Sequence, residues 1–171
     1  MTTKNDPIIR RTFAVIVDNE PGVLSRVVGL FSGRGYNIES LTVTEVDADR
    51  GRSRITIITN GTYQILEQIE NLLRRLVPVH KVQDLTTDIQ TVERELAMVK
   101  VVGKGEDRVE ALRLAQTFGA DVVDASLEHF VFELHNSEAE VNRFIDLMRG
   151  LGLVEICRSG VIAVARGKEA I

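Results

Sequence analysis

The sequence has a single cysteine, Cys157, among its 171 residues. A disulfide within the chain and a thiolate metal cage each need more than one cysteine, so both are excluded. The longest apolar runs, such as residues 27–31, are far shorter than the roughly 18 residues expected of a membrane span. The opening stretch MTTKNDPIIRR also lacks the apolar core of a signal peptide. We therefore expect a protein of the reducing cytoplasm that does not interact with membranes.

Basic residues are not in excess either, because 21 Lys and Arg stand against 25 Asp and Glu. Proteins that bind nucleic acids usually carry a basic patch that displaces counterions from the phosphates. The nearest approach is Arg50, Arg52 and Arg54, whose alternate spacing would place them on one face of a strand. We interpret these arginines as the solvated outer edge of a sheet and expect no nucleic-acid partner.

Residues that would indicate an enzyme are scattered. His80, His129 and His135 are too far apart in sequence to predict a metal cluster, and Cys157 has no paired histidine motif. We interpret Cys157 as an inert, partly buried thiol. The stretch GLFSGRGYN, residues 29–37, follows a predicted helix instead of opening one, and no G-x-x-x-x-G-K-[ST] motif occurs. We expect no catalytic residue, no metal site and no cofactor of the chain's own.

The two halves of the sequence show the same order of predicted strands and helices. In the first half, alternating and helical apolar spacings predict a strand at 12–17, a helix at 23–31, strands at 35–46 and 52–59, a helix at 60–76 and a strand at 77–85. The second half predicts a strand at 95–103, a helix around 109–118, strands at 119–127 and 129–135, a helix opened by a Ser137–Glu140 capping box, and strand residues at 153–165.

Each half therefore reads as a βαββαβ unit, which folds as an antiparallel sheet with both helices on one face. We predict an α+β protein with two ferredoxin-like domains. The boundaries that we assign are a tail at 1–12, a first domain at 13–86, a linker at 87–92 and a second domain at 93–171. Because the helix-free face of each sheet would be bare and the domains are small, we also expect the chain to form a dimer.

The stretch DNEPGVLSRVV, from residue 18 onward, joins the first predicted strand to the first helix. Pro21 suits the first helical turn, and Gly22 leaves the backbone open beside it. The N–H groups of Val23, Leu24 and Ser25 would then be free to bind a carboxylate or phosphate at the positive end of the helix dipole.

The side chains beside this joint favour a zwitterion over a phosphate. Asn19 supplies an amide and a carbonyl, whereas Asp18 and Glu20 would oppose a highly charged anion. A second interpretation fits the same residues, namely a well-capped turn between strand and helix with no ligand. The pattern alone does not decide between the two.

The order of elements with NEPGVLSRVVGLFSGRGYNIESLTV resembles the ACT domain, a regulatory module that binds amino acids, over residues 13–86. That same stretch, with ERELAMVKV opening the second half and EICRSGVIAVARG near the end, resembles the small regulatory subunits of acetohydroxyacid synthase, also called acetolactate synthase. This resemblance covers nearly the whole chain.

The resemblance implies a noncatalytic protein that binds and activates the catalytic large subunit and confers feedback inhibition by valine. Thiamine diphosphate, magnesium and FAD would belong to that catalytic subunit. It also implies a homodimer through the ACT domains with valine between them, held by Asn19, Gly22, Val23, Leu24 and Ser25 of one chain and Asn37 and Ile38 of its neighbour. An alternative that stays open is an autonomous ACT-type amino-acid sensor that regulates another enzyme or a transcription factor.

The second half lacks this joint. VGKGEDR stands at the corresponding place and puts Lys104, Glu106 and Asp107 around the helix start. We expect no equivalent amino-acid site there, and we expect the second domain to serve dimerisation or docking on the catalytic subunit.

Overall fold

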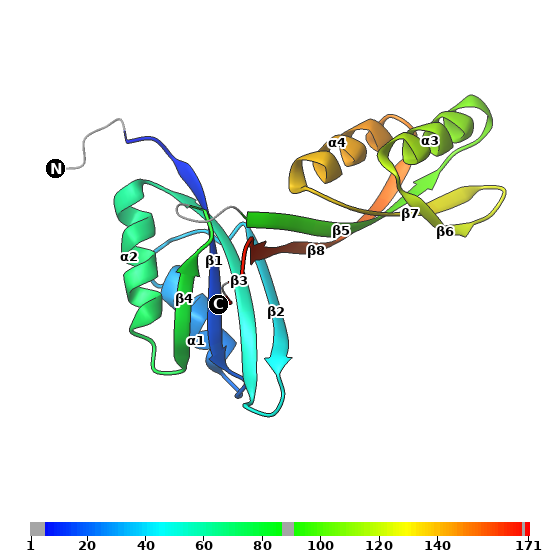
Figure 1. Cartoon of the computed structure of the whole chain (residues 1–171). Coiled ribbons are helices and arrows are strands. Elements are labelled where there is room, and N and C mark those ends of the chain that lie inside the picture. Colours follow the sequence, from blue (N-terminus) through cyan, green and yellow to red (C-terminus); the bar gives the residue numbers. More distant parts are fainter. Residues whose placement is uncertain (1–5, 87–90, 169) are drawn as a thin grey trace. The chain divides into compact units, whose positions relative to one another are not determined.

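The structure is a computed structural model that describes residues 6–86, 91–168 and 170–171. Its elements are β1 (Ile9–Asp18), α1 (Val23–Ser32), β2 (Ser40–Asp47), β3 (Arg52–Gly61), α2 (Tyr63–Arg74), β4 (Val79–Asp84), β5 (Thr91–Val102), α3 (Gly105–Phe118), β6 (Asp121–Ala125), β7 (His129–Asn136), α4 (Glu138–Arg149) and β8 (Leu153–Ala165) (Figure 1). The strands form two antiparallel sheets of four. The predicted pair of βαββαβ folds is confirmed.

The chain divides into two compact units. The first contains the residues up to 92 together with residues 162–171, and the second contains residues 93–161. The last ten residues, which we assign by sequence to the second domain, thus belong by their contacts to the first unit. Most of the linker expected at 87–92 lies outside the described residues, and β5 already begins at Thr91.

In the first unit, β1 lies inside a sheet of order β2-β3-β1-β4, and α1 and α2 cover one of its faces (Figure 1). Alternate residues of β1 point to that face, and α2 contributes residues at helical spacing. The buried side chains that meet there include Phe13, Val15, Val17, Val27, Phe31, Leu66, Ile69 and Leu73. Burial of each large apolar side chain stabilises the fold by roughly 1.5–3 kcal/mol.

The first strand starts earlier than the apolar alternation predicts. β1 begins at Ile9, which pairs with Gly61 of β3, and Arg11 pairs in the same ladder with Thr59. Arg11 is buried beside Asp84, with its Nε 3.1 Å from a carboxylate oxygen and its guanidinium over the ring of Tyr63. Residues 9–12 therefore extend the sheet and are not part of a tail. The charged side chains of Arg10 and Arg11 interrupt the apolar alternation, so the sequence pattern does not predict this part of the strand.

The helix-free face of the first sheet is not bare, contrary to our expectation. Ala14 and Leu85 are buried on it, and Ala163 of the C-terminal segment packs against them. The segment is also held by hydrogen bonds: Arg54 donates to the carbonyl of Ala163 at 2.7 Å, and Lys81 donates to that of Ala170 at 2.9 Å. We call residues 162–168 and 170–171 the C-terminal strap. They cover part of a face that the sequence pattern leaves open.

The interpretation of the arginine cluster as a solvated edge is wrong for two of its three members. Arg52 and Arg54 are half-buried, and only Arg50 is exposed. The reason is the C-terminal strap, which lies over the same face of the sheet and shares a cavity with these side chains.

The second unit repeats the arrangement with the order β6-β7-β5-β8. Its core joins α3 and α4 to one face of the sheet and includes Ala97, Val99, Phe132, Leu134, Val141, Phe144 and Met148. Phe132 and Phe144 meet edge to face at 6.1 Å between ring centroids, a favourable aromatic geometry. Arg158 donates two hydrogen bonds to the buried Glu95 carboxylate, and this raises the pKa of Arg158 above its ordinary value.

The predicted capping box at the start of α4 is only half formed. The hydroxyl of Ser137 accepts a hydrogen bond from the backbone N–H of Glu140, as the motif requires. The reciprocal bond is replaced, because the N–H of Ser137 donates to the side chain of Asn136 and the Glu140 carboxylate binds Arg143. The two side chains of the motif therefore act independently of each other.

We expect Ser137→Ala to lower the free energy of unfolding by about 1 kcal/mol, the usual cost of losing an N-terminal cap. Glu140→Ala should cost about 0.5 kcal/mol through its ion pair and the helix dipole. Because no reciprocal bond links the two side chains, the double variant should show the sum to within about 0.5 kcal/mol. Urea unfolding of the three variants measures this, and a clear coupling energy would indicate a complete capping box.

Candidate functional site

The candidate site is the joint between β1 and α1. Pro21 and Gly22 are the two central residues of a tight turn, in which the N–H of Val23 donates to the carbonyl of Glu20 at 3.3 Å. Gly22 has φ 84° and ψ −7°, which are the angles of the second central residue of a type II turn. Proline followed by glycine is the usual pair for this turn, because proline fixes a negative φ and glycine tolerates a positive one.

The helix begins at Val23, as predicted, but Pro21 does not lie in its first turn, contrary to our expectation. The left-handed conformation of Gly22 cannot belong to a right-handed helix, so Gly22 is the N-terminal cap, α1 starts at Val23 and Pro21 lies outside the first helical turn. The first helical hydrogen bond runs from the N–H of Arg26 to the carbonyl of Gly22 at 3.1 Å.

This geometry leaves two open donors instead of the three we expected. The N–H of Val23 is used by the turn, whereas the N–H groups of Leu24 and Ser25 have no acceptor within the part of the chain that the structure describes. Leu24 and Ser25 are both exposed, so a ligand can reach these groups. Together with the helix dipole, two adjacent N–H groups suit a carboxylate.

Asn19 is fixed beside these donors. Its backbone N–H donates to the carbonyl of Gly51 at 2.7 Å, and its side-chain nitrogen donates to a carboxylate oxygen of Glu45 at 3.0 Å. On the other side, the carboxylate of Asp18 pairs with the ring of His80. The turn between β2 and β3 and the start of β4 thus hold the joint from two directions.

The surroundings of the joint are acidic. Glu20 and Glu45 are exposed, Glu45 accepts a hydrogen bond from Asn19, and Asp18 pairs with the ring of His80 and lies opposite Arg52 in the ladder. Carboxylates around a binding site attract an ammonium group and repel a second negative charge. The joint therefore suits a ligand that carries one carboxylate and one ammonium group. The roles of Glu45 and His80 were missed at the sequence level, because they reach the joint through strand register and no local motif marks them.

Asn37 and Ile38 lie at the other end of the same unit. The side-chain nitrogen of Asn37 donates to Glu39 at 2.7 Å, its carbonyl accepts from the hydroxyl of Thr59 at 2.6 Å, and Ile38 packs half-buried against the core.

The register of the sheet separates these residues from the joint. Asp18 pairs with Arg52, whereas Ser40, which follows Asn37 and Ile38, lies beside Ile58, the partner of Thr12. Thr12 and Asp18 are six positions apart along β1, and at about 3.4 Å per residue this corresponds to roughly 20 Å between the joint and the row of Ser40. One chain alone therefore does not bring together all the residues that we expect to bind valine.

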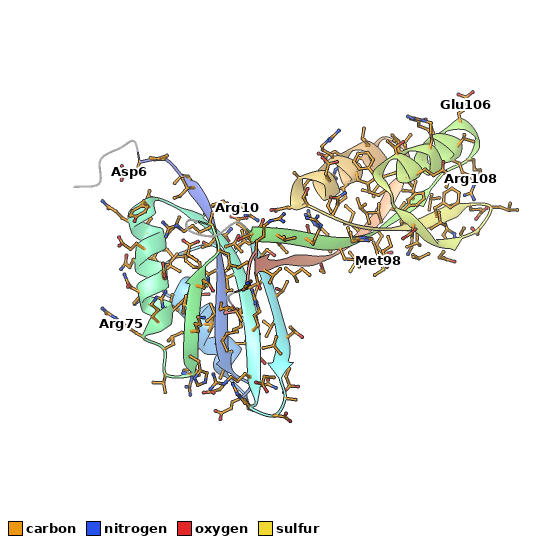
Figure 2. The ribbon with its side chains drawn as sticks, in the orientation of Figure 1. Asp6, Arg10, Arg75, Met98, Glu106 and Arg108 are labelled. Carbon is orange, nitrogen blue, oxygen red and sulfur yellow. The ribbon has the colours of Figure 1, made fainter. Side chains whose placement is uncertain are left out.

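The corresponding joint of the second unit is different. Lys104 caps α3 without a side-chain hydrogen bond, and Gly105 has a positive φ of 62°. Glu106 and Asp107 occupy the first turn of α3, where the helix dipole stabilises them, and Figure 2 labels Glu106 at this position. These two carboxylates repel a ligand carboxylate.

The remaining groups considered in the sequence do not form a second site among the described residues. Cys157 is exposed, so its interpretation as a partly buried thiol is wrong; it lies on a strand with neither face fully covered. Among the described residues no three His, Cys, Asp or Glu side chains gather as a metal site. Of the helices in the described ranges, none has the length and apolarity to cross a membrane.

A family model for the ACT domain of acetohydroxyacid synthase small subunits matches residues 13–81, and a model for the small subunit of acetolactate synthase matches residues 94–167. The acetolactate synthase small subunit of Haemophilus influenzae is 44% identical over 164 residues, which cover 95% of this chain and 99% of that one. A probable acetolactate synthase small subunit of Archaeoglobus fulgidus is 42% identical over 161 residues, covering 94% and 99%.

A solved structure agrees with these matches. The crystal structure of the acetolactate synthase small subunit from Thermotoga maritima superposes with a TM-score of 0.83 at 34% identity, and the match covers 94% of this chain and 99% of that one. The first unit is accordingly an ACT domain, and the chain belongs to the family of acetolactate synthase small subunits.

Proposed function

We propose that this protein is the noncatalytic regulatory subunit of an acetolactate synthase, that it binds and activates the catalytic large subunit, and that valine bound at its ACT domain inhibits the complex. The observation that carries the proposal is the joint of β1 and α1, with two open N–H groups beside an acidic rim, in a chain of this family. The chain's own residues contribute binding and not chemistry, and the thiamine diphosphate, magnesium and FAD belong to the catalytic subunit.

The two charged groups of valine have matching groups at the joint. The carboxylate accepts hydrogen bonds from the N–H groups of Leu24 and Ser25, and Gly22 leaves room for it because no atom lies within 4 Å of where a side chain would start. The ammonium group lies near the oxygen of Asn19 and the carboxylate of Glu45. Val23 contributes the start of the helix to the site, and its own side chain is buried.

The isopropyl group is bound by a second copy of the chain. Because Asn37 and Ile38 lie roughly 20 Å from the joint of their own unit, a partner copy supplies them in a dimer through the ACT domains. A two-fold axis then creates two equivalent sites. Burying the isopropyl group against Ile38 contributes about 0.8 kcal/mol per methylene, so selectivity among branched-chain amino acids is modest.

Regulation follows if valine binds more tightly to one arrangement of the ACT dimer than to another. A coupling free energy of about 1–3 kcal/mol between valine and the catalytic state suffices for strong inhibition. The second unit supplies the contact with the catalytic subunit or a part of the dimer interface.

The test is to mix the protein with its cognate catalytic subunit and to measure acetolactate formation with and without valine. We expect the protein to raise the activity and valine to reduce it. A pull-down distinguishes the alternative. If the protein does not bind the catalytic subunit but binds an unrelated enzyme or transcription factor, it is an autonomous amino-acid sensor.

A further inference from the structure

A cavity lies in the first unit, on the face of the sheet opposite α1 and α2. Its volume is about 480 Å³, within the range of pockets that hold small organic molecules. Ile16 of β1 and Leu85 form an apolar floor, and Val164 and Ile171 of the C-terminal strap form part of the wall. The floor and this part of the wall belong to the same compact unit.

Arginines line the remaining side of this cavity. Arg52 and Arg54 are half-buried, and Arg50 lies at the more exposed margin, where its Nε is 3.6 Å from the carboxylate of Asp47. Among the described side chains that line the cavity, three guanidinium groups stand against one carboxylate, that of Asp47.

Two of these arginines are incompletely satisfied. The Nε of Arg52 is buried and has no hydrogen-bond acceptor among the described residues. Arg54 makes one hydrogen bond to the neutral carbonyl of Ala163, and its burial lowers the pKa of its guanidinium below the ordinary value. Partial burial of a charged group without an ionic partner is costly, and an anion in the cavity would lower that cost.

We propose that this cavity is a binding site for a small organic carboxylate without an ammonium group, held by Arg52 and Arg54 and covered by the C-terminal strap. The planar fork of a guanidinium matches a carboxylate, and a short apolar body fits over Ile16 and Leu85. Asp47 in the wall disfavours a multiply charged phosphate.

The charges around this cavity are opposite to those around the joint of β1 and α1. The joint is acidic and open to an ammonium group, whereas the cavity repels one through Arg50, Arg52 and Arg54. Valine and 3-methylbutanoate differ by the ammonium group, so this pair of molecules separates the two sites.

The test is a titration of the full chain with 3-methylbutanoate, followed by ¹H–¹⁵N NMR spectra that include the Nε–Hε signal of Arg52. We expect this signal and the backbone signals of residues 163–167 to shift on addition of 3-methylbutanoate and to stay in place on addition of valine. Arg52→Gln should weaken the binding at least about tenfold through the loss of charge-assisted hydrogen bonds.

Arg75→Gln is the matched control, because Arg75 is exposed at the end of α2 (Figure 2) and does not line the cavity. It should bind 3-methylbutanoate like the unchanged protein. Unchanged binding in Arg52→Gln, or absence of any shift of the Arg52 signal, would overturn the proposal. Equal shifts with inorganic phosphate at the same ionic strength would overturn the assignment to a carboxylate.

A further variant separates this proposal from the proposed function. Gly22→Asp alters the joint and leaves the cavity intact, so it should retain the response to 3-methylbutanoate. Loss of the response in Gly22→Asp would mean that the two ligands share one site, which contradicts the proposal for the cavity. The binding of valine to Arg52→Gln tests the joint independently.

Discussion

Gly22→Asp is expected to reduce the affinity for valine at least about 100-fold, which corresponds to roughly 3 kcal/mol or two charge-assisted hydrogen bonds. Gly22 is the N-terminal cap of α1, and a cap aspartate accepts hydrogen bonds from the N–H groups of the second and third helical residues. In this helix those groups belong to Leu24 and Ser25, the proposed donors to the ligand carboxylate. The new side chain also adds a negative charge at the place of that carboxylate.

Isothermal titration calorimetry with valine measures this effect, and feedback inhibition of the reconstituted enzyme should be lost in parallel. Gly22→Ala is the matched control, since it has the same positive φ, costs about 1 kcal/mol in backbone strain and leaves the donors free. It should bind valine with a loss of tenfold or less. Undiminished binding in Gly22→Asp, or an equal loss in both variants, would refute the site at the start of α1.

Asp84→Ala is expected to destabilise the first unit by about 3–5 kcal/mol, because it leaves a buried arginine without its partner. Arg11 and Asp84 are both almost completely buried, with 3.1 Å between Nε and the carboxylate oxygen Oδ2. Nε and Oδ2 form an ion pair without the geometry of a hydrogen bond, whereas the other carboxylate oxygen, Oδ1, accepts a hydrogen bond from the N–H of Thr86 at 2.8 Å. Urea unfolding of the full chain, followed by circular dichroism, measures the change.

The control is a more accessible pair on α2. Glu70 accepts a hydrogen bond from Arg74 at 2.7 Å, and the two side chains are 23% and 50% exposed, so Glu70→Ala should cost less than about 1 kcal/mol. Replacing both members of the buried pair, as in Arg11→Met with Asp84→Leu, should recover much of the lost stability. Equal effects of Asp84→Ala and Glu70→Ala would show that burial of the pair contributes nothing.

Local patterns were sufficient to predict the order of helices and strands. The helical spacing of Leu66, Ile69 and Leu73 gives one apolar face, and the structure buries all three against the sheet. The joint was also predictable, because Pro21 and Gly22 form a turn through their own backbone preferences. From the sequence we placed Pro21 in the first helical turn, whereas in the structure it precedes the helix. The sequence does not distinguish the two positions, because a type II turn and the first turn of a helix both accept proline.

Features that depend on distant residues were not predictable in the same way. The contact of Asn19 with Glu45 depends on strand register, and no pattern within either strand indicates it. The covering of Ala14 by Ala163 joins residues about 150 positions apart, and small apolar residues carry no signal for such a pairing. Arg52 and Arg54 looked like surface residues because the covering segment lies at the far end of the sequence.

The C-terminal strap has a consequence for the time course of synthesis. The four strands and two helices of the first unit have all been synthesised when residue 92 is added, but residues 162–171 follow only after about 70 further residues. At about 5–20 residues per second this delay is roughly 4–14 s. During that interval Ala14 and Leu85 lack Ala163 as a neighbour, so the nascent ACT domain presents an apolar strip to chaperones until translation ends.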